Sequence, residues 1–233
     1  MACARVSGMN KLMIFSVLLV FFVALLENSQ TETERKIERE ASEWCNTWVS
    51  AAHLNDKPRV LMIGDSITNA YYNLASEALA DKAYGAKLTT SACVADPAFL
   101  KQLEAILGQH EFAVIHFNNG LHGFGYTEQE YQAGYERAIE YIRKIAPSAK
   151  LIVALSTPLQ STSKQNELNP RIDERNKIAR ALAEKYKAKT NDLHSISKGH
   201  PEYYSDPYHY KKEAVELQAR QVGEALAASL ESE

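Results

Sequence analysis

The 233-residue sequence contains few cysteines, and no two of the three have the C-x-x-C spacing of a metal or redox site. It also lacks an excess of basic residues, because 26 Lys and Arg stand against 29 Asp and Glu, for a net charge of −3. No stripe of Lys and Arg alternates with aromatic residues, so the sequence does not favour a nucleic-acid-binding protein. P-loop, H-E-x-x-H and G-x-G-x-x-G motifs are absent, which removes the usual signatures of nucleotide-binding and zinc-dependent enzymes.

Long apolar runs are missing except for one near the N-terminus. Residues 12–26 are uncharged and mostly apolar, with Arg5 and Lys11 before them and a polar stretch after them. This pattern is typical of a secretory signal, and the run is short for a membrane-spanning helix. We expect residues 1–26 to direct secretion or periplasmic export, or, because no clear cleavage site follows, to remain as a membrane anchor. Residues 27–57 are then a lead-in segment, and 58–233 a single domain.

Two cysteines, Cys45 and Cys93, follow the apolar run, whereas Cys3 precedes it. In an oxidising compartment Cys45 and Cys93 can form a disulfide, which would contribute roughly 4 kcal/mol by the chain-entropy model. Two separate thiols are the alternative, because the sequence does not show that their Cα atoms approach each other.

Short apolar runs alternate with amphipathic helical patterns along the rest of the chain, which is typical of an α/β domain with a mostly parallel sheet. Five strands are predicted, at 59–63, 87–91, 113–117, 151–155 and ending near 193. Helices are predicted in the lead-in segment (37–52), at 66–82, after Asp96-Pro97, after the capping box 127–130, at 171–187 and at 211–230. Ligands bind at the carboxyl ends of the strands in such a sheet, so we expect the functional residues to follow the strands.

Ser66 lies at the turn between the first predicted strand and its helix. A serine becomes a nucleophile when a base accepts its proton and a third group orients that base. His209 can be the base and Asp206 the orienting group, since both precede the last predicted helix and lie three residues apart. The backbone N–H of Ser66 would belong to the first turn of a helix and could bind an oxyanion. For Ser66 taken alone, a helix N-cap is the alternative role.

The segment Gly64-Asp65-Ser66-Ile67-Thr68, together with Asp206-x-x-His209, resembles the GDSL/SGNH hydrolase family in order and spacing from about residue 58 to the C-terminus. This resemblance implies a flavodoxin-like three-layer α/β/α fold with a five-stranded parallel sheet. It also implies a serine esterase or acyl hydrolase that needs no metal or cofactor. Ser66, Asp206 and His209 would be its catalytic triad.

The family also uses an Asn in a Gly-x-Asn-Asp motif and a Gly after the second strand as oxyanion donors. By this resemblance Asn118 is a donor, together with the backbone N–H of Ser66. His116 stands where the family has Gly, and Asn119 where it has Asp. Residues 91–95 contain no Gly, so the sequence does not identify the second backbone donor.

Several further residues are candidates for lining the pocket: Asp65, Cys93, His116, Asn119, His122 and Tyr208. A structural role in the turn is favoured for Asp65. His116 shares a strand face with Asn118, so it points either into the site or into the core. Tyrosines at 203, 204, 208 and 210 surround the Asp206/His209 turn, where they can stack on a sugar ring or be ordinary exposed loop residues.

Residues 117–122, 156–158 and 191–193 resemble secreted bacterial family members associated with carbohydrate, which implies a short acyl group such as acetyl on a saccharide. One alternative is a lysophospholipase or thioesterase, although the polar loop 156–170 favours a hydrophilic carrier. The other is a non-catalytic saccharide-binding module. We expect no nucleic-acid partner and no membrane contact beyond the N-terminal segment. The oligomeric state is left open.

Overall fold

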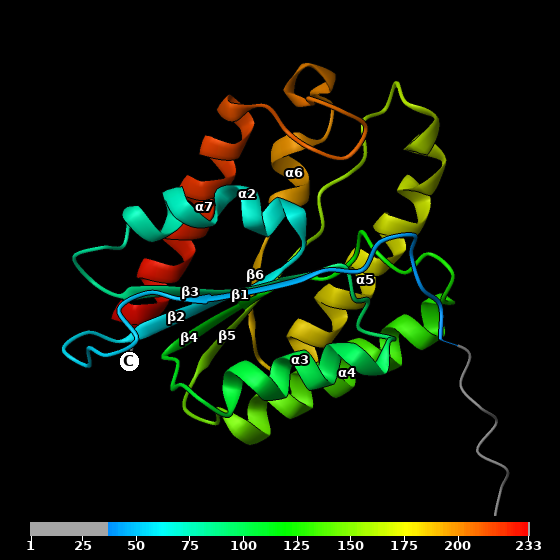
Figure 1. Ribbon diagram of the computed structural model, residues 1–233. Coiled ribbons are helices and arrows are strands. Elements are labelled where there is room, and N and C mark those ends of the chain that lie inside the picture. The colour runs from blue at the N-terminus through cyan, green and yellow to red at the C-terminus, as the bar shows by residue number, and fades with distance from the viewer. Residues whose placement is uncertain (1–36, 233) are drawn as a thin grey trace, which may run out of the picture. The chain divides into compact units, whose positions relative to one another are not determined.

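The computed structural model describes residues 37–232, which include one sheet of six strands in the order β1-β3-β2-β4-β5-β6. The strands are β1 (Cys45–Val49), β2 (Arg59–Gly64), β3 (Tyr84–Thr90), β4 (Val114–Phe117), β5 (Lys150–Ala154) and β6 (Lys189–Asn191). All neighbouring pairs are parallel except β1 and β3. Figure 1 shows helices on both faces of the sheet, so the three-layer α/β/α fold expected from the sequence is confirmed.

The five predicted strands are present, but the lead-in helix is wrong. Its place is taken by β1, which adds a sixth, antiparallel strand along β3, with Cys45 opposite Thr90 and Val49 opposite Ala86. Trp44, Trp48 and Ala52 fit a helical period, but residues 45–49 also include Thr and Val, which favour strands. The free edge of β3 supplies the backbone partners that this segment needs, so pairing prevails over the helical pattern.

The helices are α2 (Ser66–Glu77), α3 (Pro97–Leu107), α4 (Glu128–Ile145), α5 (Asn169–Lys185), α6 (Leu193–Ser197) and α7 (Lys212–Glu231), with the short 3₁₀ helices η1 (Lys164–Leu168) and η2 (Pro201–Tyr203). Five of the helices match predicted ones apart from their ends, whereas α6 and the two 3₁₀ helices were not predicted. The capping box forms at the start of α4, where the Thr127 side chain accepts from Glu130 N–H and the Glu130 carboxylate accepts from Thr127 N–H. Helix α2 is shorter than predicted, because the chain turns after Glu77 to begin β3.

Alternating residues of β2 pack into two separate apolar cores, one on each face of the sheet. Val60 and Met62 belong to the cluster beneath α2 and α7, whereas Leu61 and Ile63 belong to the cluster beneath α3, α4 and α5. All four are completely buried. A strand buried on both faces is typical of a parallel sheet covered by helices on either side.

The strand order places a topological switch at the carboxyl end of β2. The chain leaves β2 through α2 and returns as β3 on one side, while β4 lies on the other side. Ligands bind at such switch points in open α/β sheets. Ser66, the first residue of α2, therefore lies where the fold favours a site.

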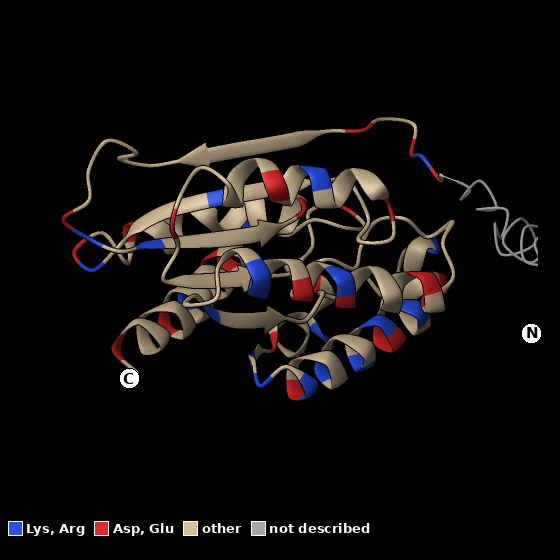
Figure 2. Cartoon of the chain, turned by 90° about the horizontal axis from the view of Figure 1, so that it is seen from below, with Lys and Arg blue, Asp and Glu red and all other residues tan. Residues whose placement is uncertain are grey.

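Charged side chains of both signs are interspersed along the helices, whereas the edge strand β1 carries none (Figure 2). The two cysteines that the structure describes are free thiols, with Cys45 exposed and Cys93 buried, so they do not form the disulfide that the sequence left open. The predicted export segment and Cys3 lie outside the described residues. Within 37–232, no helix is both long and apolar enough to cross a membrane.

Candidate active site

The N-terminus of α2 holds Ser66 in a fixed turn. The Asp65 carboxylate caps the helix by accepting from Ile67 N–H at 2.9 Å, and the Asp65 carbonyl accepts from Asn69 N–H at 2.9 Å. A Cβ at Gly64 would overlap the Thr68 hydroxyl, so glycine is needed for the first turn to pack on the strand end. Asp65 thus has the structural role expected for it, and the Ser66 N–H has no acceptor among the described residues.

Asp206 and His209 lie in the hairpin-like segment 203–211, which brings them to Ser66. His209 Nε2 is 2.9 Å from Ser66 Oγ, and His209 Nδ1 is 2.8 Å from Asp206 Oδ2. Asp206 Oδ1 also accepts the backbone N–H groups of Tyr208 and His209, both at 2.8 Å. Burial raises the pKa of Asp206, but these hydrogen bonds and His209 outweigh that effect and lower it overall. The carboxylate therefore stays ionised and holds the imidazole with one nitrogen toward Ser66.

Asn118 continues β4 beside the end of β2, where its backbone N–H donates to Ile63 at 2.9 Å. Its buried side-chain amide donates to the Ala154 carbonyl at 2.9 Å and to Ser156 Oγ at 3.2 Å. A hydroxyl can rotate and accept other donors, so the second of these bonds is the one that an oxyanion can replace.

The loop after β3, residues 91–96, is where a second backbone donor was expected but no glycine occurs. Asn119 fixes this loop, because its side chain accepts from Val94 N–H at 3.1 Å and donates to the Ala92 carbonyl at 3.0 Å. Of the other N–H groups of the loop, those of Ser91 and Ala92 donate to the Trp44 carbonyl and to Thr90 Oγ1. Those of Ala95 and Asp96 donate to the sulfur and the carbonyl of Cys93. The N–H of Cys93 is left without an acceptor in the described part of the chain. Asn119 therefore shapes the loop, and Cys93 presents the free donor.

The loop after β4, residues 120–126, is held by a buried arginine of α5. The Arg175 guanidinium is completely inaccessible and donates to the carbonyls of Gly120, His122 and Gly123 at 2.7–3.0 Å. It also forms an ion pair with Glu128 at 2.9 Å. This network was not predicted, because nothing in the sequence links α5 to that loop.

A segment that precedes β1, residues 38–44, crosses the same loops, and we call it the N-terminal strap. Its Glu40 carboxylate bonds to His122 Nδ1 at 2.9 Å and accepts Gly123 N–H at 3.2 Å. Glu43 accepts from Ser91 Oγ at 2.8 Å. Burial lowers the pKa of His122, but Glu40 and the nearby acidic groups outweigh this and raise it overall. The structure thus places His122 under the strap, engaged with Glu40.

His116 points into the core beneath α2 rather than into the site. Its ring is fully buried, lies edge-on to Tyr71 at 6.3 Å between centroids, and has Nε2 3.1 Å from the Asn191 amide. Burial lowers its pKa to about 4, so this histidine is neutral at ordinary pH. Of the two orientations left open by the sequence, the structure shows the one toward the core.

Two of the four tyrosines near the triad are buried supports. Tyr204 and Tyr210 both donate their hydroxyl groups to the Pro158 carbonyl, at 2.8 and 2.9 Å, and their rings pack at 4.5 Å. They are not free to stack on a sugar. Tyr203 and Tyr208 are half-buried, and the Tyr208 ring lies 6.4 Å from that of His209, at the edge of the site.

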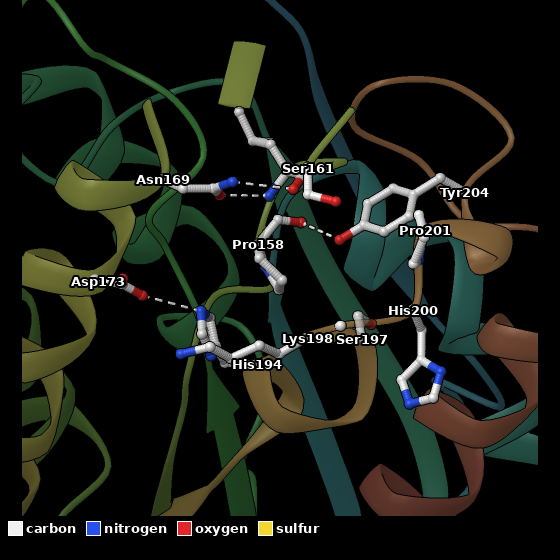
Figure 3. Close-up of a pocket in the computed structure, with 12 residues that line it drawn as sticks. Pro158, Ser161, Asn169, Asp173, His194, Ser197, Lys198, His200, Pro201 and Tyr204 are labelled. Carbon is white, nitrogen blue, oxygen red and sulfur yellow. Dashed lines mark hydrogen bonds and ion pairs between the residues drawn. The ribbon is translucent and has the colours of Figure 1, made fainter. Parts of the chain in front are cut away.

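Two hollows lie near the triad. The larger, about 170 Å³, is bounded by Pro158, Tyr204 and residues of α6 and the following turn (Figure 3). None of the triad residues lines it. The smaller, about 10 Å³, touches Ile67 and Asn118 and has room for about one water molecule.

The comparison with known families settles the relationship. A family model described as GDSL-like lipase/acylhydrolase matches residues 62–216, more than half of the chain. The chain belongs to this family. The matched range contains Ser66, Asp206 and His209, which the fold of this GDSL-like hydrolase brings together. No curated protein shows significant sequence similarity to the chain.

Solved structures with the same fold include hydrolases of this family. A GDSL-like lipase from Parabacteroides merdae is 19% identical, with a TM-score of 0.62, 75% of this chain covered and 97% of that one. The acetyl xylan esterase AlAXEase is 20% identical, with a TM-score of 0.60 and coverages of 72% and 99%. The acetylxylan esterase Axe2 from Geobacillus stearothermophilus is 12% identical, with a TM-score of 0.58 and coverages of 76% and 95%. At these identities the likeness shows the fold of the GDSL-like hydrolase.

Proposed function

We propose that this GDSL-like hydrolase is a secreted serine esterase that removes a short acyl group, such as acetyl, from a saccharide. The observation that carries the proposal is the continuous hydrogen-bonded set from Ser66 through His209 to Asp206, at 2.9 and 2.8 Å. A carboxylate, an imidazole and a hydroxyl in this order are the arrangement that activates serine for acyl transfer.

In the first half-reaction, Ser66 Oγ attacks the ester carbonyl while His209 Nε2 accepts the hydroxyl proton. The resulting oxyanion receives the N–H of Ser66 and, after the amide turns away from Ser156, the side chain of Asn118. We propose the unpaired N–H of Cys93 as the second backbone donor. Collapse of the tetrahedral intermediate breaks the bond to the alcohol, which leaves with the proton that His209 returns.

In the second half-reaction, His209 removes a proton from water, and the hydroxide attacks the acyl group on Ser66. The second tetrahedral intermediate releases the carboxylic acid, and His209 returns its proton to Ser66 Oγ. Asp206 remains ionised throughout and stabilises the imidazolium that forms in each half-reaction.

The proposed preference for a short acyl group is supported by the small size of the hollow between α2 and Asn118. The hollow that touches Ile67 and Asn118 is about 10 Å³, which accommodates one water molecule and not an alkyl chain. The triad is also open to solvent, because about half of the Asp206 and His209 side-chain surfaces is exposed. An open site with a shallow acyl space suits an acyl group on a large hydrophilic carrier.

The test compares the full chain with its Ser66→Ala variant on p-nitrophenyl esters of increasing acyl length and on acetylated xylo-oligosaccharides. We expect kcat to fall about 10⁶-fold in the variant, as when a triad serine is removed. Acetyl esters should be preferred over long-chain esters. Retained activity in Ser66→Ala would exclude the serine mechanism, a preference for long chains would favour the lysophospholipase or thioesterase alternative, and no turnover at all would favour a binding module.

A further inference from the structure

The face of the edge strand β1 that lies on the α2 side carries Trp48. Residues 44, 46 and 48 alternate with 45, 47 and 49, and Trp48 is paired directly with Lys87 of β3. Lys87 reaches α2, where its Nζ is 2.7 Å from Asn69 Oδ1 and 4.9 Å from the centre of the Tyr72 ring. Because directly paired residues point to the same face of a sheet, Trp48 lies on the side of α2 as well.

Trp48 is exposed and yet held in one orientation. Its side chain is 59% exposed, more than any other large apolar residue in the described part of the chain. Its Nε1 donates to Ser50 Oγ at 3.2 Å, and Ser50 Oγ lies 3.3 Å from the Tyr72 hydroxyl. The indole N–H is therefore linked through Ser50 to Tyr72 of α2, while much of the ring meets solvent. Ordering such a side chain in advance reduces the entropy lost when a ligand binds to it.

Polar groups connect this indole to the catalytic serine. Asn69 lies one helical turn after Ser66 on α2, and its amide adjoins Lys87. Asn46, exposed on β1, lies between Trp48 and the site end of the strand. The register puts Trp48 level with Met62. Trp48 therefore lies roughly 13 Å from Ser66 along the strands and about 10 Å from it across them. A ligand that touches both ends must be an extended chain.

We propose that β1 and the adjoining side of α2 form a saccharide-binding subsite, which holds the chain whose ester is at Ser66. Trp48 would stack on the apolar face of a sugar ring, and Asn46, Asn69 and Lys87 would bond to its hydroxyl groups. The proposal rests on the proposed function and extends it from an acylated sugar to an acylated sugar chain. An aromatic ring beside two amides and one ammonium group fits an uncharged ligand with an apolar face and a polar rim.

The uncharged character of β1 supports the choice of a neutral chain. Edge strands usually carry lysine, proline or a bulge that prevents pairing with another chain. Strand β1 has neither of these residues, and its register with β3 is continuous. Figure 2 shows the strand free of charge along the border of the sheet. A second copy of the protein pairing with this edge is the competing occupant, and the experiment below separates the two.

The experiment uses the full chain and compares Trp48→Ala, Trp48→Phe and the matched control Ile145→Ala, which removes an exposed apolar side chain from the end of α4. The measured quantity is kcat/KM for acetylated xylo-oligosaccharides of increasing length, divided by kcat/KM for p-nitrophenyl acetate. We expect this ratio to rise with length in the parent and to fall about tenfold in Trp48→Ala for the longer chains, through KM, as for the loss of one stacked ring. Trp48→Phe should retain most of the ratio, and Ile145→Ala all of it.

A ratio that is unchanged in Trp48→Ala, or that falls equally for all lengths, would overturn the subsite while leaving the esterase in place. A change of oligomeric state in Trp48→Ala on size-exclusion chromatography, with an unchanged ratio, would assign the edge to pairing between copies. If the parent hydrolyses no ester, calorimetry with unacetylated xylo-oligosaccharide tests the subsite directly. Binding that Trp48→Ala weakens supports it, and absence of binding to the parent overturns it.

Discussion

Two loops at the carboxyl end of the sheet are held in opposite ways. The segment 203–211, with Asp206 and His209, is closed by contacts within itself, such as Ser205 N–H to the His209 carbonyl at 2.9 Å and Lys211 N–H to the Tyr203 carbonyl at 2.7 Å. The loop 120–126 is held from outside, by Arg175 of α5 and Glu40 of the strap. The first carries two residues of the proposed triad, whereas the second carries mostly backbone carbonyls that need a donor.

The two loops differ in how their backbone polar groups find hydrogen-bond partners. A short hairpin can satisfy its own backbone, so its side chains are left for chemistry. A loop whose carbonyls turn inward needs hydrogen-bond donors from elsewhere in the fold, which the buried guanidinium supplies here. Each carbonyl removed from water without a donor would destabilise the fold by about 1–3 kcal/mol. We therefore expect substitutions in the hairpin to affect the rate, and those around Arg175 to affect stability.

Within these two loops, the largest expected effect is on the rate, from Asp206→Asn. The amide oxygen can still accept the N–H groups of Tyr208 and His209, so the hairpin should keep its shape. The amide cannot stabilise the imidazolium or hold the same tautomer, and we expect kcat to fall about 10⁴-fold. Steady-state kinetics together with thermal unfolding would check this. A loss smaller than tenfold would contradict the assigned role.

The next effect is on stability, from Arg175→Met. The carbonyls of Gly120 and His122 would lose their donor, whereas that of Gly123 would keep the N–H of Tyr126. Glu128 would also lose one of its partners, so we expect the free energy of unfolding to fall by about 3 kcal/mol. Urea denaturation measures it. Arg180→Met is the matched control, because its ion pair with Asp192 at 2.6 Å is half-exposed and contributes less than about 1 kcal/mol. Equal losses in the two variants would show that the buried arginine has no special role.

A smaller effect is expected beneath the hairpin. Tyr204→Phe and Tyr210→Phe each remove one of two hydroxyl donors to the Pro158 carbonyl, at a cost of about 1 kcal/mol each. The double variant leaves that carbonyl without either donor, so its loss should exceed the sum of the single losses. A double-mutant cycle by thermal unfolding tests the coupling, and strict additivity would rule it out.

The smallest effect depends on pH and involves Glu40 and His122. The pKa of His122 is raised above its ordinary 6.5, so its stabilisation is complete below that value and is lost as the pH rises through the raised pKa. The pKa of Glu40 is lowered below 4.5, because His122 and Gly123 outweigh its burial, so its share is complete above 4.5 and lost in more acidic solution. Glu43 and Asp65 also face His122 and raise its pKa.

Glu40→Gln should therefore lower stability most between pH 4.5 and 6.5, by less than about 1 kcal/mol because the pair is partly exposed, and least above the raised pKa of His122. Unfolding by urea at a series of pH values measures the difference from the parent. A difference that does not vary with pH would show that the ion pair does not hold the strap.

The contrast between the loops also explains what the sequence could predict. Asp206 and His209 are three residues apart and follow a strand-and-helix pattern, so they could be recognised before the fold was known. Arg175 bonds to backbone carbonyls more than 50 residues away. Every residue has a backbone carbonyl, so the residue types do not indicate which ones Arg175 binds. The resemblance placed Asn119 in a motif, but the hydrogen bonds by which it holds the loop 91–96 depend on tertiary contacts.

The strand β1 was missed for a related reason. Trp44, just before the strand, and Trp48, within it, fit a helical period as well as a strand period, and the open edge of β3 decides between them. Short amphipathic segments are ambiguous in this way, and the partner that decides lies elsewhere in the chain.

The antiparallel direction of β1 has a consequence for attaching the protein to a surface. Because β1 runs against the other strands, the strap before it lies at the edge of the sheet where Ser66 sits, whereas α7 ends near the opposite edge, with Lys150 at the start of β5 bonded to Ser232. Figure 1 shows these two ends of the described chain on opposite sides. A support joined ahead of Glu38 would draw the edge with Ser66 toward itself. Immobilisation through the C-terminus would leave that edge facing outward, open to the long, slowly diffusing substrate that we propose.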